Sequence, residues 1–272
     1  VGIGCGLTYV KEAFSNYFLH YNLFFDNAKF IEQELAFYKE AEVRGIEEEN
    51  MIADALKKYP RKNIVVYHKN CADGFGAATV FYKRFKDEVD YFPGSYTDQM
   101  YDLELFRDRG VYLVDFSYKR EVVEEIIKIA KFVRLIDHHK SALEDLKGLK
   151  NLDFCNSSNE FSGAMLAWRW LFPTEVPPLM IDFIQDRDLW KFKYPETKDF
   201  SQYLFSLDYD FEVWLKVMED SGNSWSLADM LAQGAGIERK HMKDVQEPSM
   251  DACSIRIGNT IVPCLNVPYM MA

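Results

Sequence analysis

The sequence has no apolar run of the roughly 18–20 residues that a helix needs to cross a bilayer. It also has little positive charge: its 272 residues carry a formal net charge of −11. Nonspecific binders of long duplexes usually present a basic face, so this charge argues against that class of protein. The apolar start, Val1 to Leu7, has no basic leader and is too short for a signal peptide. We therefore expect a cytoplasmic protein without a membrane partner.

The sequence also lacks closely spaced pairs of cysteines. The five cysteines are scattered and none stands in a CxxC spacing, which predicts reduced thiols instead of a disulfide framework or a structural zinc site. A hydrophobic share of 48% and a charged share of 28% are ordinary for a globular protein. The length is sufficient for one large domain or two modest ones.

The first part of the chain is predicted to be helical. Aromatic and aliphatic residues such as Phe14, Phe18, Ile31 and Leu35 recur at roughly helical spacing up to Pro60. We interpret residues 1–60 as a helical N-terminal extension that serves core packing or homodimer formation.

From Asn63 the pattern changes to short apolar runs that alternate with helical segments. We expect strands at 64–67, 89–92, 111–115, 133–137 and 152–154. Strands that alternate with helices at this spacing indicate βαβ units and a mainly parallel sheet. The sequence thus predicts an α/β fold, with a core domain over residues 61–222.

After residue 162 the chain is mainly helical, with helices expected at 163–172, 178–186, 211–218 and 226–245. We interpret residues 223–249 as a helical linker. Gly258-Asn259, between two apolar runs that start at Ser254, predicts a hairpin with a two-residue turn. Residues 250–272 are therefore expected to open a second module.

Polar residues of metal-binding types follow three of the expected strands. His68 is followed by Asp73, the third strand ends in Asp115, and the fourth ends in Asp137-His138-His139. A single Asp at a strand end is more often a turn former or a helix cap. The ends of neighbouring parallel strands converge, however, and together these carboxylates and imidazoles suit a pair of divalent ions.

The triplet Asp137-His138-His139 resembles the signature of the DHH phosphoesterase superfamily. That superfamily includes RecJ-type exonucleases, oligoribonucleases, cyclic-dinucleotide phosphodiesterases and family II pyrophosphatases. Three further stretches resemble its other motifs in the same order, so that the resemblance covers about residues 63–190: His68 to Gly74, Asp115, and Ile184 to Trp190.

The resemblance implies a role for each matching residue. The metal ligands would be His68, Asp73, Asp115, His138 and Asp186. His139 would face the substrate phosphate, and Asp137 would orient the cluster. Asp186 is preferred to Asp188 because an aromatic residue follows it by four positions.

One feature departs from the family pattern. Many relatives carry two acids in the first motif, whereas this sequence has Asp73 and, two residues before it, Cys71. Cys71 is either a soft metal ligand or a small buried filler, and the second interpretation is favoured.

The ligand set predicts two ions, Mn²⁺ or Mg²⁺, that activate a bridging water for attack on a phosphate. His139, Lys140 and Arg187 could then contact phosphate oxygens, although Lys140 and Arg187 are equally well explained as solvated surface charges. We expect a hydrolase for phosphodiester bonds of short oligonucleotides, dinucleotides or single-stranded ends. The alternatives are a pyrophosphate or polyphosphate hydrolase and a catalytically weak metal-binding scaffold.

Three other motifs bear on binding. Gly74 to Thr79 follows a strand as a dinucleotide fingerprint would, but the third glycine is missing and Asp73 would repel a pyrophosphate. Trp190 to Tyr194 alternates aromatic and basic residues, and inward packing of its three rings is favoured over base stacking. The GGGH-like motif of DHH-associated domains does not occur, so we expect that domain to be truncated.

Overall fold

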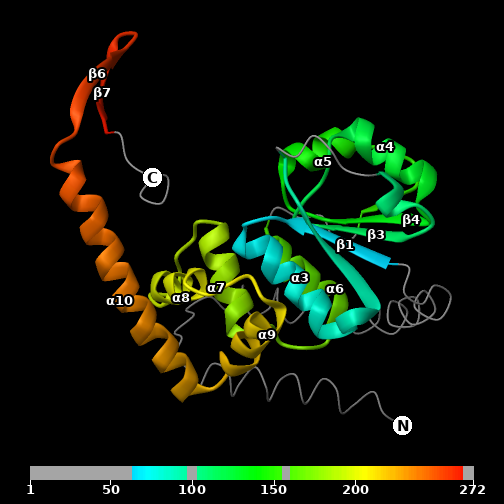
Figure 1. Ribbon diagram of the computed structural model, residues 1–272, viewed down its shortest axis with the longest axis horizontal. Coiled ribbons are helices and arrows are strands. Elements are labelled where there is room, and N and C mark those ends of the chain that lie inside the picture. The colour runs from blue at the N-terminus through cyan, green and yellow to red at the C-terminus, as the bar shows by residue number, and fades with distance from the viewer. Residues whose placement is uncertain (1–62, 97–102, 155–159, 266–272) are drawn as a thin grey trace, which may run out of the picture.

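The computed structural model describes residues 63–96, 103–154 and 160–265. It shows an α/β core joined to a group of helices, from which one long helix leads to a hairpin (Figure 1). The expected helical extension of residues 1–60 lies outside the described residues. None of the helices in the described ranges has the length and apolar character that a membrane crossing requires.

The core is built on a five-stranded sheet with the strand order β2-β1-β3-β4-β5, in which every neighbouring pair is parallel. The strands are β1 Asn63–His68, β2 Val89–Gly94, β3 Gly110–Val114, β4 Phe132–Ile136 and β5 Leu152–Phe154. In β1, Ile64, Val65 and Val66 are all fully buried. A parallel sheet covered on both faces requires such continuous apolar runs. The predicted α/β fold with a mainly parallel sheet is confirmed.

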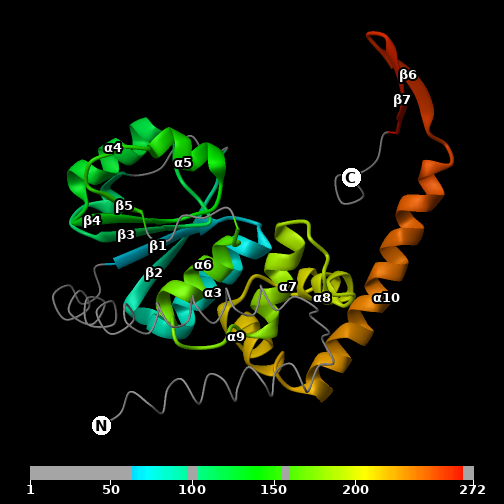
Figure 2. The same ribbon diagram turned by 180° about the vertical axis from the view of Figure 1, so that it is seen from behind.

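Helices cover both faces of this sheet (Figures 1 and 2). Those of the core are α3 Ala72–Phe85, α4 Arg120–Ile129, α5 Lys140–Leu146 and α6 Gly163–Leu171, with short 3₁₀ turns at Lys86–Glu88 and Leu103–Phe106. Alternate residues of β1 point to opposite faces, so Val65 packs with Phe75 of α3 while Val66 belongs to the second core with Ile126 of α4. The sheet thus packs against helices on both of its faces.

The second half of the described chain is helical, as expected. It contains α7 Leu179–Asp188, α8 Thr197–Phe205, α9 Phe211–Asp220 and α10 Ser224–Ser249. The sequence did not predict α8, which packs closely against α10. A side chain at Gly234 of α10 would collide with the carbonyl oxygen of Asp199 in α8, so the glycine permits this approach.

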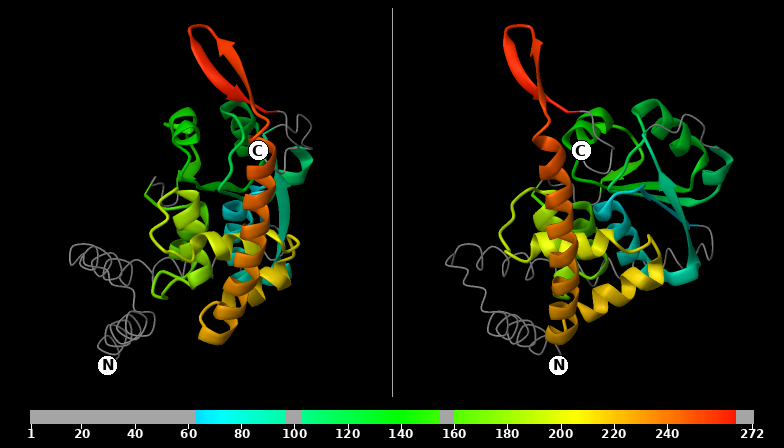
Figure 3. Two further views of the ribbon diagram at one scale, coloured as in Figure 1. Left: turned by 90° about the vertical axis from the view of Figure 1, so that its left-hand side faces the viewer. Right: turned by 60° about the vertical axis from the view of Figure 1, so that its left-hand side comes forward.

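The predicted hairpin is present as β6 Cys253–Ile257 and β7 Thr260–Cys264. Gly258 in its turn has a φ of +59°, a conformation that glycine adopts without strain. The hairpin projects beyond the end of α10 (Figure 3), and every residue of β6 is exposed. That this segment opens a second domain stays a prediction.

Candidate metal centre

Three strands of the sheet end at the same level. Tyr67 of β1 pairs with Val114 of β3, and Val114 pairs in turn with Ile136 of β4. The next residue along each strand is polar: His68, Asp115 and Asp137. The register therefore brings the three predicted strand ends to one edge of the sheet.

Asp115 lies at the middle of this edge, and its side chain is 1% exposed. Its backbone N–H donates to the carbonyl oxygen of Ile136 at 2.9 Å, and its φ is +51°. Its two carboxylate oxygens face different groups. Oδ1 is 3.2 Å from His138 Nε2, whereas Oδ2 is 3.6 Å from Cys71 Sγ and 3.8 Å from His68 Nδ1. Asp115 is thus placed between two sets of possible ligands.

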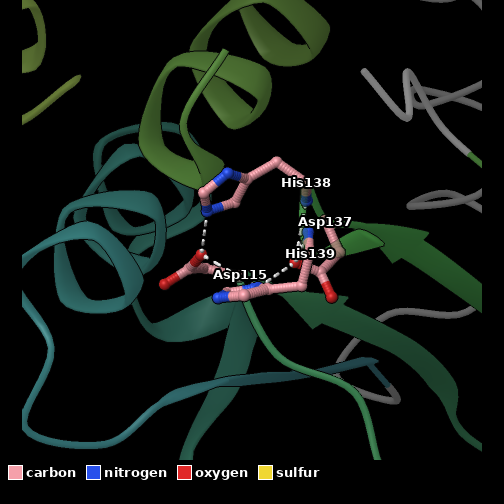
Figure 4. A group of neighbouring side chains, drawn as sticks. All are labelled: Asp115, Asp137, His138 and His139. Atoms are coloured by element: carbon pink, nitrogen blue, oxygen red, sulfur yellow. Dashed lines mark hydrogen bonds and ion pairs between the residues drawn. The ribbon is translucent and has the colours of Figure 1, made fainter. Parts of the chain in front are cut away.

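The His138 ring faces several carboxylates at once. Its Nε2 is 3.2 Å from Asp115 Oδ1 and 3.5 Å from one oxygen each of Asp73 and Asp188. Figure 4 shows the ring directed at Asp115. A single nitrogen surrounded by three carboxylates is the arrangement expected around a shared cation.

Asp73 connects the sheet edge to α6. Its two oxygens accept hydrogen bonds from the backbone N–H groups of Gly163 and Ala164, at 2.5 and 2.9 Å. These N–H groups belong to the first turn of a helix, which favours a negative charge. A Cβ at Gly163 would lie 2.5 Å from the Cβ of Asp115, so only glycine allows this approach. Sequence reasoning missed this contact, although Ser162-Gly163 before an apolar helix is a helix-start signal.

Asp137 orients the two histidines that follow it. Its Oδ1 accepts from the backbone N–H of His138 at 2.8 Å and of His139 at 3.2 Å, and lies 2.7 Å from His139 Nδ1. An ionised carboxylate can only accept, so His139 Nδ1 carries a proton there. The contact with Asp137 raises the pKa of His139 to about 9, against the opposing effect of burial.

The negative charge of Asp115 opposes the ionisation of two other acids of the cluster, Asp73 and Asp188. Burial raises the pKa of Asp73 and of Asp188, and the charge of Asp115 raises both further. Burial would also raise the pKa of Asp115, but the His138 and His68 rings lower it to about 2. Close carboxylates that disfavour one another's charge are stabilised by a cation placed between them.

The residues at this edge fit divalent ions. Among the described residues, Asp115 Oδ1, Asp137 Oδ2, His68 Nδ1 and His138 Nε2 are buried and make no hydrogen bond. Buried polar atoms rarely stay unpaired unless an ion or a water completes them. Three sets have ligand atoms within 4.8 Å of one another: Asp115 with Asp137, His138 and His139; His68 with Cys71 and Asp115; and Asp73 with His138 and Asp188.

The structure places Asp186 outside this cluster. Its carboxylate, which is 3% exposed, accepts from the N–H groups of Lys193 and Tyr194 at 2.8 and 3.2 Å and from Thr197 Oγ1 at 2.5 Å. Two positions later on the helix, about 200° around its axis, Asp188 faces His138. The geometry thus favours Asp188 over the Asp186 that the sequence had suggested.

The two predicted phosphate-binding cations have different surroundings. Lys140 is exposed at the start of α5. The guanidinium of Arg187 lies over the ring of Phe205, 4.4 Å from its centre. Arg187 also lines a small pocket together with Cys71 and Asp188, which brings it beside the cluster.

The segment after α7 departs from the predicted inward packing. The Trp190 side chain is 74% exposed, and the backbone φ is +54° at Trp190 and +44° at Phe192. Tyr194 does pack inward, edge-on against Phe183 at 5.7 Å. The prediction is therefore wrong for Trp190, whose ring is presented to solvent two residues after Asp188.

No family model matches the chain. It is 32% identical over 184 residues to "Uncharacterized protein R106" of Acanthamoeba polyphaga mimivirus, covering 60% of this chain and 44% of that relative. The chain therefore spans less than half the length of the curated relative it matches.

Among solved structures, the chain is similar to RecJ in complex with Mn²⁺ from Thermus thermophilus. The match has 11% sequence identity and a TM-score of 0.35, and it covers 75% of this chain and 39% of that one. The chemistry of this edge of the sheet depends on the side chains described above. Those side chains form a DHH-like Asp-His-His cluster at the carboxyl edge of a five-stranded parallel sheet.

Proposed function

We propose that this protein is a metal-dependent phosphodiesterase of the DHH type, with two Mn²⁺ or Mg²⁺ ions as its cofactors. The observation that carries the proposal is the placement of Asp115, whose two oxygens face separate sets of possible ligands. Ions held by these residues would lower the pKa of a water and would offset the charge of an attacked phosphate. A purely structural cluster would satisfy its buried atoms with hydrogen bonds, and this one leaves four of them without any.

The chain's own residues would position the substrate phosphate. Asp137 holds the His139 ring through Nδ1, which leaves Nε2 to donate to a nonbridging oxygen. Because the pKa of His139 is raised to about 9, the metal-free ring is cationic at neutral pH. Arg187, held over Phe205, offers a forked donor of the kind that suits phosphate oxygens.

Exposed aromatic side chains near the cluster favour a substrate with nucleobases. Trp190 is 74% exposed, and the exposed residues Lys191 and Lys193 follow it. Tyr96, which is 57% exposed, lies edge-on to the His68 ring with centroids 5.1 Å apart. Bases stack on such rings irrespective of sequence. We therefore place short oligonucleotides or single-stranded ends ahead of pyrophosphate, which would make no use of these rings.

Turnover measurements with Mn²⁺ test this proposal. Dinucleotides, cyclic dinucleotides, short oligonucleotides and pyrophosphate should be compared on the wild type. We expect hydrolysis of the diesters, and preferential hydrolysis of pyrophosphate would contradict the substrate class. A metal-loaded protein that turns over none of them would support the scaffold alternative.

A variant at Trp190 separates binding of the base from the chemistry. Base stacking on one aromatic ring contributes about 1–3 kcal/mol. Trp190→Ala should therefore raise KM for an oligonucleotide by roughly 5- to 150-fold. Turnover of a small chromogenic diester without a nucleobase should stay unchanged. Trp225→Ala, at an exposed tryptophan of α10, is the matched control. Equal effects of Trp190→Ala on both substrates would contradict stacking.

A further inference from the structure

Cys71 lies immediately before α3, at the edge of the sheet where the candidate ligands gather. Its Sγ is 3.6 Å from Asp115 Oδ2. The sulfur, His68 Nδ1 and an Asp115 oxygen all lie within 4.8 Å of one another. The thiol is therefore part of a three-atom set and not an isolated cysteine.

The surroundings of Cys71 do not fit an apolar filler. A filling cysteine packs its sulfur against hydrocarbon, as a small hydrophobic residue would. Here the sulfur faces a carboxylate that is 1% exposed. On the same side of the cluster, His68 Nδ1 is buried without a hydrogen bond and lies 3.8 Å from Asp115 Oδ2. An imidazole nitrogen without a hydrogen bond, a carboxylate oxygen and a thiol around one point are the features of a ligand site.

We propose that Cys71 Sγ is a ligand of one of the two ions, which makes the two metal positions chemically unequal. This inference rests on the proposed metal site. One position would take sulfur, nitrogen and oxygen from Cys71, His68 and Asp115. The other would take nitrogen and oxygen alone, from His138, Asp73 and Asp188. Asp115 belongs to both, through its two oxygens.

Because the two metal positions have different ligand atoms, we expect them to prefer different metals. Thiolate ligands favour softer ions such as zinc and iron, whereas Mg²⁺ prefers oxygen ligands in a near-ideal octahedron and is disfavoured by sulfur. We expect Mg²⁺ to compete with a softer ion only at the position formed by Asp73, His138 and Asp188. The thiol proton leaves to solvent when the ion binds, so no oxidant or reductant is required.

Cobalt(II) reports this ligand directly, because a thiolate bound to Co²⁺ gives a charge-transfer band in the near ultraviolet. Metal-stripped protein in a reductant that does not bind cobalt should be titrated with Co²⁺ while absorbance and bound metal are recorded. We expect two ions per chain and the band in the wild type. Cys71→Ser should abolish the band and lower the binding affinity of one of the two ions by at least about tenfold.

Two further variants complete the design. Cys264→Ser, at a free cysteine of the hairpin, should keep the band. Cys71→Asp should lose the band yet still bind two ions, which also shows that a substitution at this position folds. Two bound Co²⁺ ions without the band in the wild type, or a band that survives Cys71→Ser, would overturn the role of Cys71. Failure of the wild type to bind Co²⁺ would instead contradict the proposed function.

Discussion

Asp115 at the sheet edge and Asp186 in α7 are both almost fully buried carboxylates, but their surroundings differ. Three donors satisfy Asp186: two backbone N–H groups and the Thr197 hydroxyl. Asp115 instead has an oxygen without a hydrogen bond, and other carboxylates lie close to it. A buried charge with a full set of donors holds the chain in place, whereas one left incomplete is available to a ligand. Burial alone therefore does not mark the functional acid.

The strongest test of this contrast removes the charge of Asp115. Asp115→Asn should lower kcat/KM by on the order of 10²–10³-fold or more, the scale of losing one preorganised electrostatic group. Bound metal should fall with it. The fold should survive, because the substitution also removes repulsion with Asp73 and Asp188. Kinetics and elemental analysis provide the measurement, and wild-type turnover with full metal occupancy would refute the assignment.

Asp186 and Asp188 of α7 provide a matched pair. Asp186→Asn places an amide donor against existing donors, so it should lower the free energy of unfolding by about 1–3 kcal/mol and leave metal binding intact. Asp188→Asn should lose metal and turnover without that loss of stability. Urea denaturation and metal analysis of both variants decide between them. The reverse pattern would restore Asp186 as the ligand.

The two adjacent histidines should also differ. His138→Ala removes a nitrogen that faces three carboxylates and should lose one ion. His139→Ala removes a ring bound to Asp137 and should keep both ions while turnover falls. Elemental analysis of the purified variants is the measurement. Equal metal loss in both would mean that the two rings share one role.

The smallest expected effect concerns pH and the metal-free protein. The pKa of His139 is raised from 6.5 to about 9, chiefly by its contact with Asp137. A raised pKa means that the folded state binds the proton more tightly than the unfolded state does. The contribution to stability is therefore complete below about pH 6.5 and is lost as the pH rises through about 9.

The comparison to make is between wild type and His139→Ala, both stripped of metal. The difference between their urea midpoints should be largest near about pH 6 and should shrink towards about pH 9.5. A difference that stays constant over this range would show that packing, and not protonation, accounts for the contribution of His139.

Much of this arrangement could be predicted from the sequence, because it depends on strand ends. The apolar runs that precede His68, Asp115 and Asp137 fix a parallel sheet, and the register then brings the three residues together. The choice between Asp186 and Asp188 depends on where a later loop places its N–H groups, which no local pattern reveals.

Two other features of the site could not be predicted because they depend on distant parts of the chain or on unusual backbone conformations. The contact of Asp73 with Gly163 spans 90 positions of the chain. The outward direction of Trp190 follows from a left-handed backbone, which is uncommon for a bulky residue and is not predicted by alternation of aromatic and basic residues. Long-range contacts and unusual backbone dihedrals are thus the features that local sequence patterns do not predict.

The positive φ of Asp115 restricts which residues position 115 can accept. Left-handed backbone is tolerated by glycine and, among residues with side chains, most readily by asparagine and aspartate. Glycine brings no oxygen to the cluster and asparagine brings no charge. Glutamate would keep the charge, but it fits this backbone less well and its extra methylene would push the carboxylate past its neighbours. Conformation and chemistry thus select the same amino acid independently, and no single substitution at this position preserves both.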